Sequence, residues 1–250
     1  MINVLINGAL GRMGKKVYEA CVLSQDVKAI CGVDIKTNDN LDFPVYSSFK
    51  DVFEKVDVVI DFSSSASLDA VLEFVTANKI PAVLCSTGYD EVAIEKVKNA
   101  SEKTAIFRSA NMSLGVNILI ELVKKASASL TGFDIEIIEK HHNQKVDSPS
   151  GTALMLADAV KEVLPEKFYV YGREGLCGKR NADEIGIHAV RGGNIVGEHD
   201  VLFAGVSETV TLSHQATDRA VFAEGAVKAA KYIVTKKNGL YNMSDMINGR

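Results

Sequence analysis

The stretch INVLINGALGRMGKKV, residues 2–17, decides the fold of this chain. Residues 2–7 form an apolar run of the kind found in buried strands, and Gly8 ends it. From Arg12 to about Leu23, apolar residues recur at helical spacing. A strand, a glycine-rich turn and a helix in this order predict the first βα unit of a doubly wound α/β sheet.

The same alternation of strand and helix continues through the first hundred or so residues. The later strand-like runs are apolar throughout rather than alternating, which is typical of a parallel sheet covered on both faces. We therefore expect a Rossmann-like, doubly wound parallel sheet. The further strands are expected at residues 28–34, 56–62, 81–87 and 104–110, with helices at 67–78 and 90–102.

The pattern changes after Met112. Apolar and polar residues alternate in residues 133–142, and strictly so in the last of three later strand-like runs. This alternation favours an open mixed sheet with one exposed or partner-covered face in an α+β domain. The other elements expected here are helices at 113–130 and 151–163, strands at 184–191, 195–203 and 206–213, and an amphipathic helix at 219–236. We predict a dinucleotide-binding domain at 1–110, a substrate-binding and oligomerisation domain at 111–215, and a C-terminal segment, 216–250, that packs back on the first domain.

Composition excludes several classes of protein. The chain has 250 residues, 47% of them hydrophobic and 24% charged, with a net charge of −4, which is typical of a globular protein. Basic residues form no long run, so we expect no nucleic-acid or membrane partner. The four cysteines lack C-x-x-C spacing, no apolar run approaches about 18 residues, and no leader pattern precedes the first strand. These features predict a cytoplasmic protein with reduced thiols.

The glycine loop predicts a dinucleotide site. Gly8 permits a tight turn, Gly11 lets the backbone approach a pyrophosphate, and Gly14 lets the helix pack closely on the strand. The helix N-terminus attracts the phosphates, and Arg12 adds a cation. Asp34 ends the second strand, where a carboxylate accepts hydrogen bonds from the ribose hydroxyls. The alternative is a glycine-rich turn in a fold that has lost its cofactor.

Three further loops follow parallel strands at the edge where ligands bind in such sheets. They read DFSSS at 61–65, CSTGYD at 85–90 and SANMS at 109–113. Their hydroxyl and amide groups suit ribose and nicotinamide, although each loop alone also fits an ordinary helix cap. Asp34 favours NADH, whereas Lys36 would suit the 2′-phosphate of NADPH, so we expect both cofactors to be used.

The segment EKHHNQKVDSPSGTAL, residues 139–154, carries the chemistry of the second domain. His141, His142 and Lys145 supply cations and proton donors, and Ser148 or Ser150 is a good N-cap for the following helix. Gly151 and Thr152 then present free N–H groups at a helix start. This combination suits a small dicarboxylate substrate. The alternatives are a zinc site, although the i, i+4 histidine spacing and a third ligand are missing, and a solvated basic loop.

These segments together resemble the dihydrodipicolinate reductase family of the diaminopimelate route to lysine, from Ile2 to about Ile233. The resemblance is most specific in the pattern E-x-H-H-x-x-K-x-D-[SA]-P-S-G-T-A. It implies NAD(P)H-dependent reduction and a homotetramer built by the open sheet of the second domain. We expect no metal, because the histidine pair lacks the spacing and the third ligand of a zinc site. The other matching segments are NGALGRMG, VVIDFS, CSTGYDE, SANMSLGVN, RGGNIVGEHDVLF and LSHQATDRAVFAEGAVKAA.

The resemblance also implies roles for individual residues. His141 is expected to be the proton donor and acceptor and Lys145 a proton donor, while His142, Gly151 and Thr152 contact substrate. The implied cofactor contacts are Gly8, Ala9, Leu10, Gly11, Arg12, Met13, Asp34, Cys85, Ser86, Thr87, Ser109, Ala110, Asn111 and Met112.

Two departures from the family pattern leave the cofactor preference open. Ile35 stands directly after the ribose-binding acid, where dual-cofactor members often have a basic residue, and the base follows at Lys36. Ser63 and Ser64 stand where some members have an arginine. Two competing readings also remain: a two-domain dehydrogenase of amino or hydroxy acids, and a nucleotide-sensing module without turnover.

Overall fold

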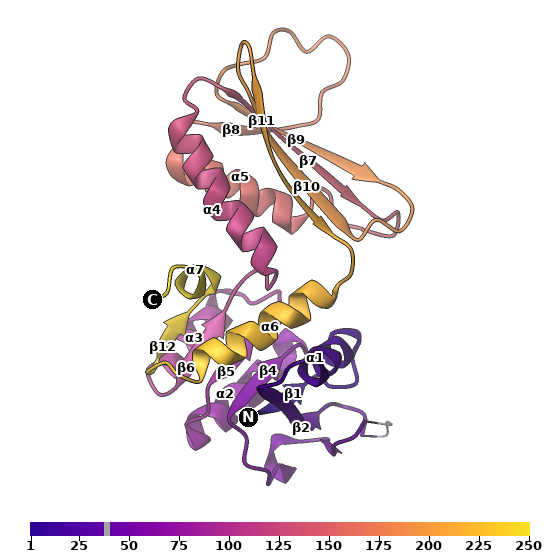
Figure 1. The fold of residues 1–250 in the computed structure, drawn as a ribbon, viewed down its shortest axis with the longest axis vertical. Helices are drawn as coiled ribbons and strands as arrows, with labels where there is room; N and C mark the ends of the chain where they lie inside the picture. Colours follow the sequence, from indigo (N-terminus) through magenta and orange to yellow (C-terminus); the bar gives the residue numbers. More distant parts are fainter. Residues whose placement is uncertain (38–40) are drawn as a thin grey trace. The chain divides into compact units, whose positions relative to one another are not determined.

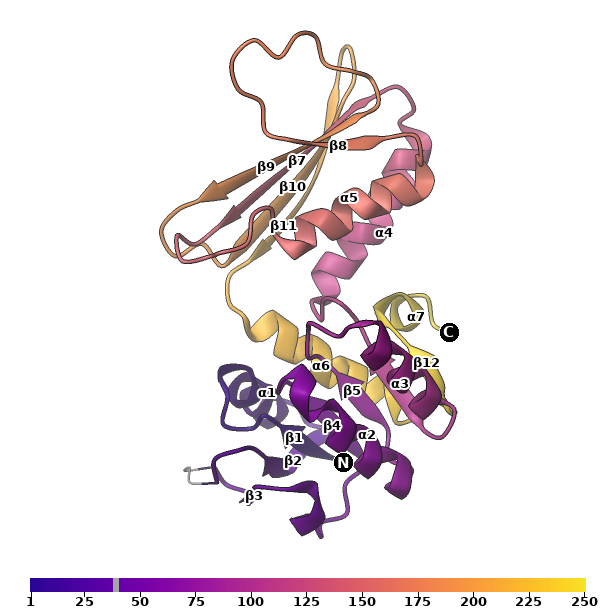
Figure 2. The ribbon, with the colours of Figure 1, turned by 180° about the vertical axis from the view of Figure 1, so that it is seen from behind.

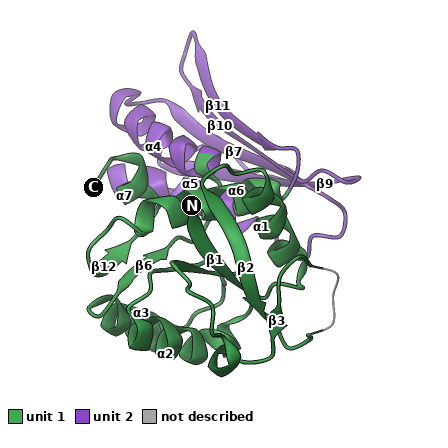
Figure 3. Cartoon of the chain, turned by 60° about the horizontal axis from the view of Figure 1, so that its bottom comes forward, with its two compact units in different colours: residues 1–114, 219–250 green, residues 115–218 purple. Residues whose placement is uncertain are grey.

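The computed structural model describes residues 1–37 and 41–250, which divide into two compact units. Unit 1 comprises residues 1–114 and 219–250, and unit 2 comprises residues 115–218 (Figure 3). The chain thus leaves unit 1 once and returns to it for its last 32 residues. The long C-terminal helix belongs to the first unit.

Unit 1 is built on a seven-stranded parallel sheet with the order β12-β6-β5-β4-β1-β2-β3. Its strands are β1 (Ile2–Asn7), β2 (Val27–Val33), β3 (Val45–Tyr46), β4 (Val58–Asp61), β5 (Ala82–Leu84), β6 (Ala105–Arg108) and β12 (Gly239–Tyr241). Its helices are α1 (Arg12–Val22), α2 (Leu68–Asn78), α3 (Glu91–Ser101), α6 (Ala220–Ile233) and α7 (Met243–Ile247), with short turns η1 (Phe49–Asp51) and η2 (Ser65–Ser67).

Both faces of this sheet are covered, which explains why its strands are apolar without alternation. One core packs β1 and β4 residues against α1, α6 and α7 (Figure 1), through side chains such as Val17 and Ile233. The other packs the opposite side of the same strands against α2 and α3 (Figure 2), through side chains such as Val71 and Val97. The predicted doubly wound parallel sheet is confirmed.

Unit 2 is a five-stranded mixed sheet with the order β11-β10-β7-β9-β8. Strand β7 runs antiparallel to β10 and parallel to β9. Helices α4 and α5 cover one face of the sheet, as both ribbon views show (Figures 1 and 2). Its elements are α4 (Leu114–Ser129), β7 (Asp134–His141), α5 (Gly151–Val163), β8 (Phe168–Tyr171), β9 (Glu184–Arg191), β10 (Gly197–Ala204) and β11 (Thr209–Ala216).

Strand β7 decides which side chains enter the interior of unit 2. Its residues alternate between half-buried and buried along the whole strand. Ile135 and Ile137 join the core beneath α4 and α5. Because side chains alternate along a strand, Glu139 and His141 point to this same helix-covered face. The predicted open mixed sheet is confirmed.

Helix α6 approaches the backbone of unit 1 through a glycine. A Cβ atom on Gly225 would lie 1.7 Å from the carbonyl oxygen of Met112, a distance that no real contact allows. The helix therefore needs glycine here, although glycine costs a helix interior about 1 kcal/mol relative to alanine.

We expect Gly225→Ala to lower the free energy of unfolding by about 1–3 kcal/mol, because the clash outweighs the gain in helix propensity. Urea unfolding followed by circular dichroism measures this change. Gly192→Ala is the control, since a Cβ there meets nothing within 4 Å. Equal effects of the two substitutions would show that the approach of α6 to Met112 is not a constraint.

Candidate active site

The glycine loop of unit 1 has the geometry that a dinucleotide requires. Gly8 has a φ of +77°, and a Cβ on Gly14 would lie 2.1 Å from the carbonyl oxygen of Gly8. Gly11 is the N-cap of α1 and offers no side chain to its first-turn N–H groups. These N–H groups can therefore receive phosphate oxygens.

Asp34 lies at the end of β2 beside this loop. Its Oδ2 accepts a hydrogen bond of 2.9 Å from the backbone N–H of Leu10, which holds the carboxylate against the turn. A cavity of about 750 Å³ in unit 1 is lined by Gly8, Gly11 and Asp34, together with Phe62 and residues of η1 and α2. Of the remaining loop residues, Ala9 is buried, Met13 is half-buried and Arg12 is exposed. The residues present thus fit a dinucleotide.

The predicted cofactor residues after β5 differ in exposure. Cys85 is buried, and burial raises the pKa of its thiol, so this side chain is a neutral packing group. Ser86 is half-buried and Thr87 is exposed. Ser86 donates a 2.9 Å hydrogen bond to Asp61, the last residue of β4.

The residues after β6 form a short connection to α4. Ser109 and Asn111 are half-buried, Ala110 is exposed and Met112 is buried. The side-chain oxygen of Asn111 accepts a 2.8 Å hydrogen bond from the backbone N–H of Ser113, which fixes the turn.

Sequence reasoning missed the buried carboxylate that joins these loops. Asp61 is fully buried and accepts hydrogen bonds from Asn7 Nδ2 at 2.8 Å and from the backbone N–H of Ser63 at 3.2 Å. With Ser86, its donors come from the ends of three neighbouring strands. The sequence did contain a signal for this pair, because Asn7 and Asp61 are polar residues at the ends of otherwise apolar strands.

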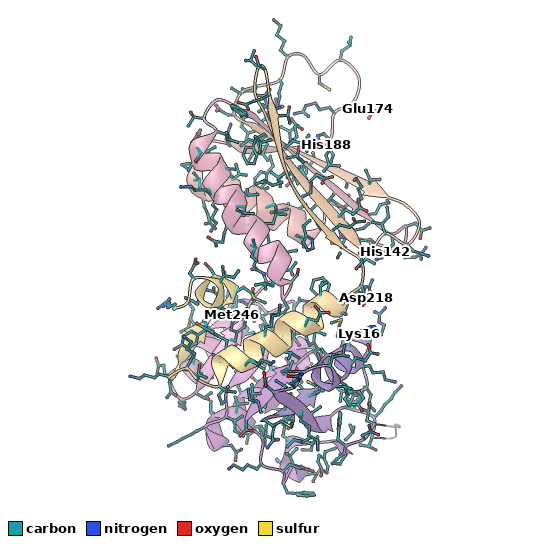
Figure 4. The ribbon with its side chains drawn as sticks, in the orientation of Figure 1. Lys16, His142, Glu174, His188, Asp218 and Met246 are labelled. Atoms are coloured by element: carbon teal, nitrogen blue, oxygen red, sulfur yellow. The ribbon has the colours of Figure 1, made fainter. Side chains whose placement is uncertain are left out.

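The segment 139–154 of unit 2 runs from the end of β7 to the start of α5. His141 is the last residue of β7 and is 8% exposed, while His142 is half-buried at the start of the loop (Figure 4). Lys145 Nζ donates a 2.8 Å hydrogen bond to Asp147 in the same loop. This lysine holds the pKa of the Asp147 carboxyl below its ordinary value.

Ser150 is the N-cap of α5, which confirms one of the two predicted caps. Its Oγ accepts a 3.2 Å hydrogen bond from the backbone N–H of Ala153. Gly151 and Thr152 are the first two residues of the helix, exposed and half-buried respectively. The first turn of α5 and the Lys145 loop are thus parts of one short segment.

A second cluster, also missed from the sequence, surrounds the catalytic candidate. His141 Nδ1 lies 2.6 Å from Oε2 of Glu139, a side chain with 0% exposure. Arg191 on β9 binds the same carboxylate through two hydrogen bonds of 2.7 and 2.8 Å. Glu139 and His141 are two residues apart on a strand, so the alternation of β7 was the signal that linked them.

His199 on β10 completes this cluster. It is 4% exposed, its Nε2 lies 3.0 Å from Ser150 Oγ, and its ring centre lies 5.2 Å from that of His141. Burial, together with the nearby His141, lowers the pKa of His199 to about 4. Burial also lowers the pKa of His141, against the opposing effect of its hydrogen bond to Glu139.

The described part of the chain, residues 1–37 and 41–250, contains no group of three or more His, Cys, Asp or Glu arranged to hold a metal ion. In the same residues, no helix has both the length and the apolar character needed to cross a membrane. Cys21, Cys31 and Cys85 are buried free thiols.

Comparisons with known proteins agree along the whole chain. Residues 2–112 match the family model of the dihydrodipicolinate reductase N-terminus, and residues 115–247 match that of the C-terminus. The chain belongs to the dihydrodipicolinate reductase family. It is therefore an oxidoreductase, and the predicted family resemblance is confirmed.

Individual relatives cover nearly all of the chain. A 4-hydroxy-tetrahydrodipicolinate reductase of Caldanaerobacter subterraneus subsp. tengcongensis is 53% identical over 99% of this chain and 98% of the relative. One from Clostridium tetani is 47% identical over the same shares. A dipicolinate-bound dihydrodipicolinate reductase from Paenisporosarcina sp. TG-14 has the same fold, with a TM-score of 0.82 and 24% identity over 97% of each chain.

The low pKa of His199 gives the stability of unit 2 a defined pH dependence. In the unfolded chain the imidazole has its ordinary pKa of 6.5, against about 4 in the folded protein. Between these values the unfolded state binds more protons, so stability is full above pH 6.5 and falls as the pH drops toward 4.

We expect the neutral burial of His199 to cost the wild type about 2–3 kcal/mol of unfolding free energy between pH 7.5 and pH 4.5. Asparagine does not titrate in this pH range, so His199→Asn should lose less stability over the same interval. The acidic residues titrate in both proteins and therefore contribute equally to the two losses. Urea unfolding at the two pH values measures the difference. Identical losses in both proteins would contradict the assignment.

Proposed function

We propose that this chain reduces 4-hydroxy-tetrahydrodipicolinate (dihydrodipicolinate) to tetrahydrodipicolinate with NADH or NADPH, in lysine biosynthesis through diaminopimelate. The observation that carries the proposal is the segment 139–152 within a chain that belongs to this reductase family. There, an imidazole at the end of β7, an ammonium group in the following loop and the N-terminus of α5 belong to one short segment.

The cofactor would be held by unit 1. When bound, NADH or NADPH supplies the hydride that reduces the substrate ring. The first-turn N–H groups of α1 and Arg12 would bind the pyrophosphate, and the carboxylate of Asp34 would accept hydrogen bonds from ribose hydroxyls. The further proposed contacts are Gly8, Ala9, Leu10, Gly11, Met13, Cys85, Ser86, Thr87, Ser109, Ala110, Asn111 and Met112.

The substrate dicarboxylate would be held by unit 2. The backbone N–H groups of Gly151 and Thr152 lie in the first turn of α5, where the positive potential of a helix N-terminus favours a carboxylate. Lys145 adds a full positive charge, which Asp147 now neutralises at 2.8 Å. A substrate carboxylate would take the place of Asp147 at this ammonium group. His142, half-buried at the start of the same loop, is a further proposed contact.

His141 and Lys145 are the proposed proton donors. Loss of the 4-hydroxyl group as water converts 4-hydroxy-tetrahydrodipicolinate to dihydrodipicolinate, to which the hydride would add. The ring then carries an electron-rich carbon that must be protonated. The imidazolium of His141 or the ammonium of Lys145 can supply that proton, and the positive charges of both groups stabilise negative charge that develops on the substrate.

We also propose that the protein works in the cytoplasm as a homotetramer. The buried free thiols of Cys21, Cys31 and Cys85 suit a reducing compartment. The sheet of unit 2 supports the oligomer, because only one of its faces is covered by α4 and α5. Its other face carries half-buried apolar side chains such as Ile138 and Leu202 among charged ones.

Calorimetric titration with pyridine-2,6-dicarboxylate, with and without NADH, tests the substrate assignment. This stable planar dianion resembles the proposed substrate, so we expect it to bind more tightly when NADH is present. Lys145→Ala should abolish this binding, whereas Lys125→Ala, an exposed lysine of α4, should retain it. Absence of binding in either state of the wild type would overturn the assignment.

Steady-state kinetics test the proton donors. We expect His141→Gln and Lys145→Ala to lower kcat by about 10²–10⁴-fold, because protonation limits the reaction without its donor. The dissociation constant for NADH should remain nearly unchanged, since neither side chain belongs to unit 1. A matching loss of NADH affinity in both variants would refute the roles given to these residues.

A further inference from the structure

The carboxylate of Glu139 has no part in the chemistry proposed above, yet it is fully buried next to the proposed acid. Four donors surround its two oxygens. Arg191 contributes two hydrogen bonds, the backbone N–H of Ser150 donates to Oε1 at 2.9 Å, and His141 Nδ1 lies 2.6 Å from Oε2. Burying a carboxylate this deeply is costly in free energy, and these hydrogen bonds and the charge of Arg191 offset that cost.

These contacts decide which partner carries the proton. Burial alone would raise the pKa of Glu139, but the hydrogen bonds from Arg191, His141 and Ser150 outweigh it and keep that pKa below its ordinary value. The carboxylate is therefore ionised and acts only as an acceptor. The hydrogen bond to His141 then requires a proton on Nδ1 of the imidazole.

The other ring nitrogen lies in a different environment. Within the described residues, the one hydrogen bond of the His141 ring is the one to Glu139. On the Nε2 side the ring faces Gly197 of β10, where a Cβ atom would lie 3.0 Å from Nε2. The glycine therefore leaves space beside Nε2 that any other residue would occupy.

We infer that Glu139, clamped by Arg191, is a positioning residue that holds His141 with its proton on Nδ1 and leaves Nε2 to exchange the proton with substrate. This inference rests on the proposed function for its chemical consequence, but the tautomer itself can be measured without turnover. It extends the site from two proton donors to a chain of three side chains on β7 and β9.

The same arrangement makes a prediction for the pH profile. A neutral residue at position 139 would remove the attraction that supports the imidazolium, so the pKa of His141 would fall further below its ordinary value. As the pH rises, kcat would then begin to decline at a lower pH than in the wild type, because protonated His141 is lost earlier. The charged and titratable groups around the ring are Glu139 on β7, Arg191 on β9, His199 on β10 and Lys145 in the loop before α5.

The first measurement is the ¹⁵N spectrum of the wild-type protein labelled at histidine, with the His141 signals identified by their loss in His141→Gln. We expect the neutral ring to be protonated on Nδ1 and unprotonated on Nε2. An Nε2–H tautomer in the wild type would overturn the inference without any variant.

The second measurement uses Glu139→Gln. Its amide can donate to Nδ1, so we expect the His141 tautomer to change to Nε2–H. We also expect kcat to fall by about 10–100-fold, as for other residues that orient a catalytic group. The basic limb of the kcat profile should move to lower pH, and the KM for NADH should stay nearly constant. An unchanged tautomer and limb would overturn the inference.

Glu136 provides a matched control on the same strand. Its carboxylate accepts hydrogen bonds from two arginines, Arg173 and Arg180, where Glu139 has one. It also lies 2.7 Å from Nε2 of His188, a residue of β9 that is labelled in Figure 4. It belongs to the other face of β7, so Glu136→Gln removes a similar ion pair away from His141. We expect this variant to keep both the His141 tautomer and the position of the basic limb.

A double variant and the combination of the two readouts separate the possible outcomes. If Glu139→Gln fails to fold because Arg191 becomes an unpaired cation, the double variant Glu139→Gln, Arg191→Met removes both charges and should show the same kinetic change. If the wild type shows an Nδ1–H tautomer but no turnover, the proposed function fails and the positioning of His141 stands. Turnover with an Nε2–H tautomer refutes the positioning alone.

Discussion

Placing an ionised carboxylate in a protein interior costs several kcal/mol unless other groups replace its lost hydration. Glu139 meets this requirement with a guanidinium, an imidazole and a backbone N–H at the start of α5. Each partner belongs to a different part of unit 2, so the single charge fixes the end of β7, the end of β9 and the first turn of α5 relative to one another. The proposed proton donor and the proposed carboxylate-binding turn are therefore set by one interaction.

Unit 1 solves a related problem with neutral groups. Asp61 is as buried as Glu139, but Asn7, Ser63 and Ser86 supply its hydrogen bonds. These donors belong to the ends of β1, β4 and β5, where the dinucleotide is proposed to lie. The donors to Asp61 are thus amide, hydroxyl and backbone N–H groups, whereas Glu139 is bound by a guanidinium. Each buried acid thus joins the ends of neighbouring elements in its unit, Asp61 through neutral groups and Glu139 through an ion pair.

The sequence predicted most of the fold because the main elements carry periodic signals. The parallel strands of unit 1 and the alternating β7 and β11 follow directly from their hydrophobic patterns. Strands β3 and β12 were missed because they have two and three residues and depend on neighbouring strands for their pairing. Strand β8 was also missed, since it has four residues and depends on its pairing with β9. The partner of Glu139 was likewise out of reach, since Arg191 is brought to it by the register of β7 and β9.

The return of the chain to unit 1 has a consequence for how the protein is made. Helix α6 buries seven residues in unit 1, and β12 forms the last strand of its sheet. The N-terminal unit therefore stays incomplete on the ribosome until the final residues have been synthesised. Unit 2 is one continuous stretch, residues 115–218, and all of its strands and helices are available earlier. Domains usually fold in their order of synthesis, but here the unit that begins second is the first whose whole chain is present.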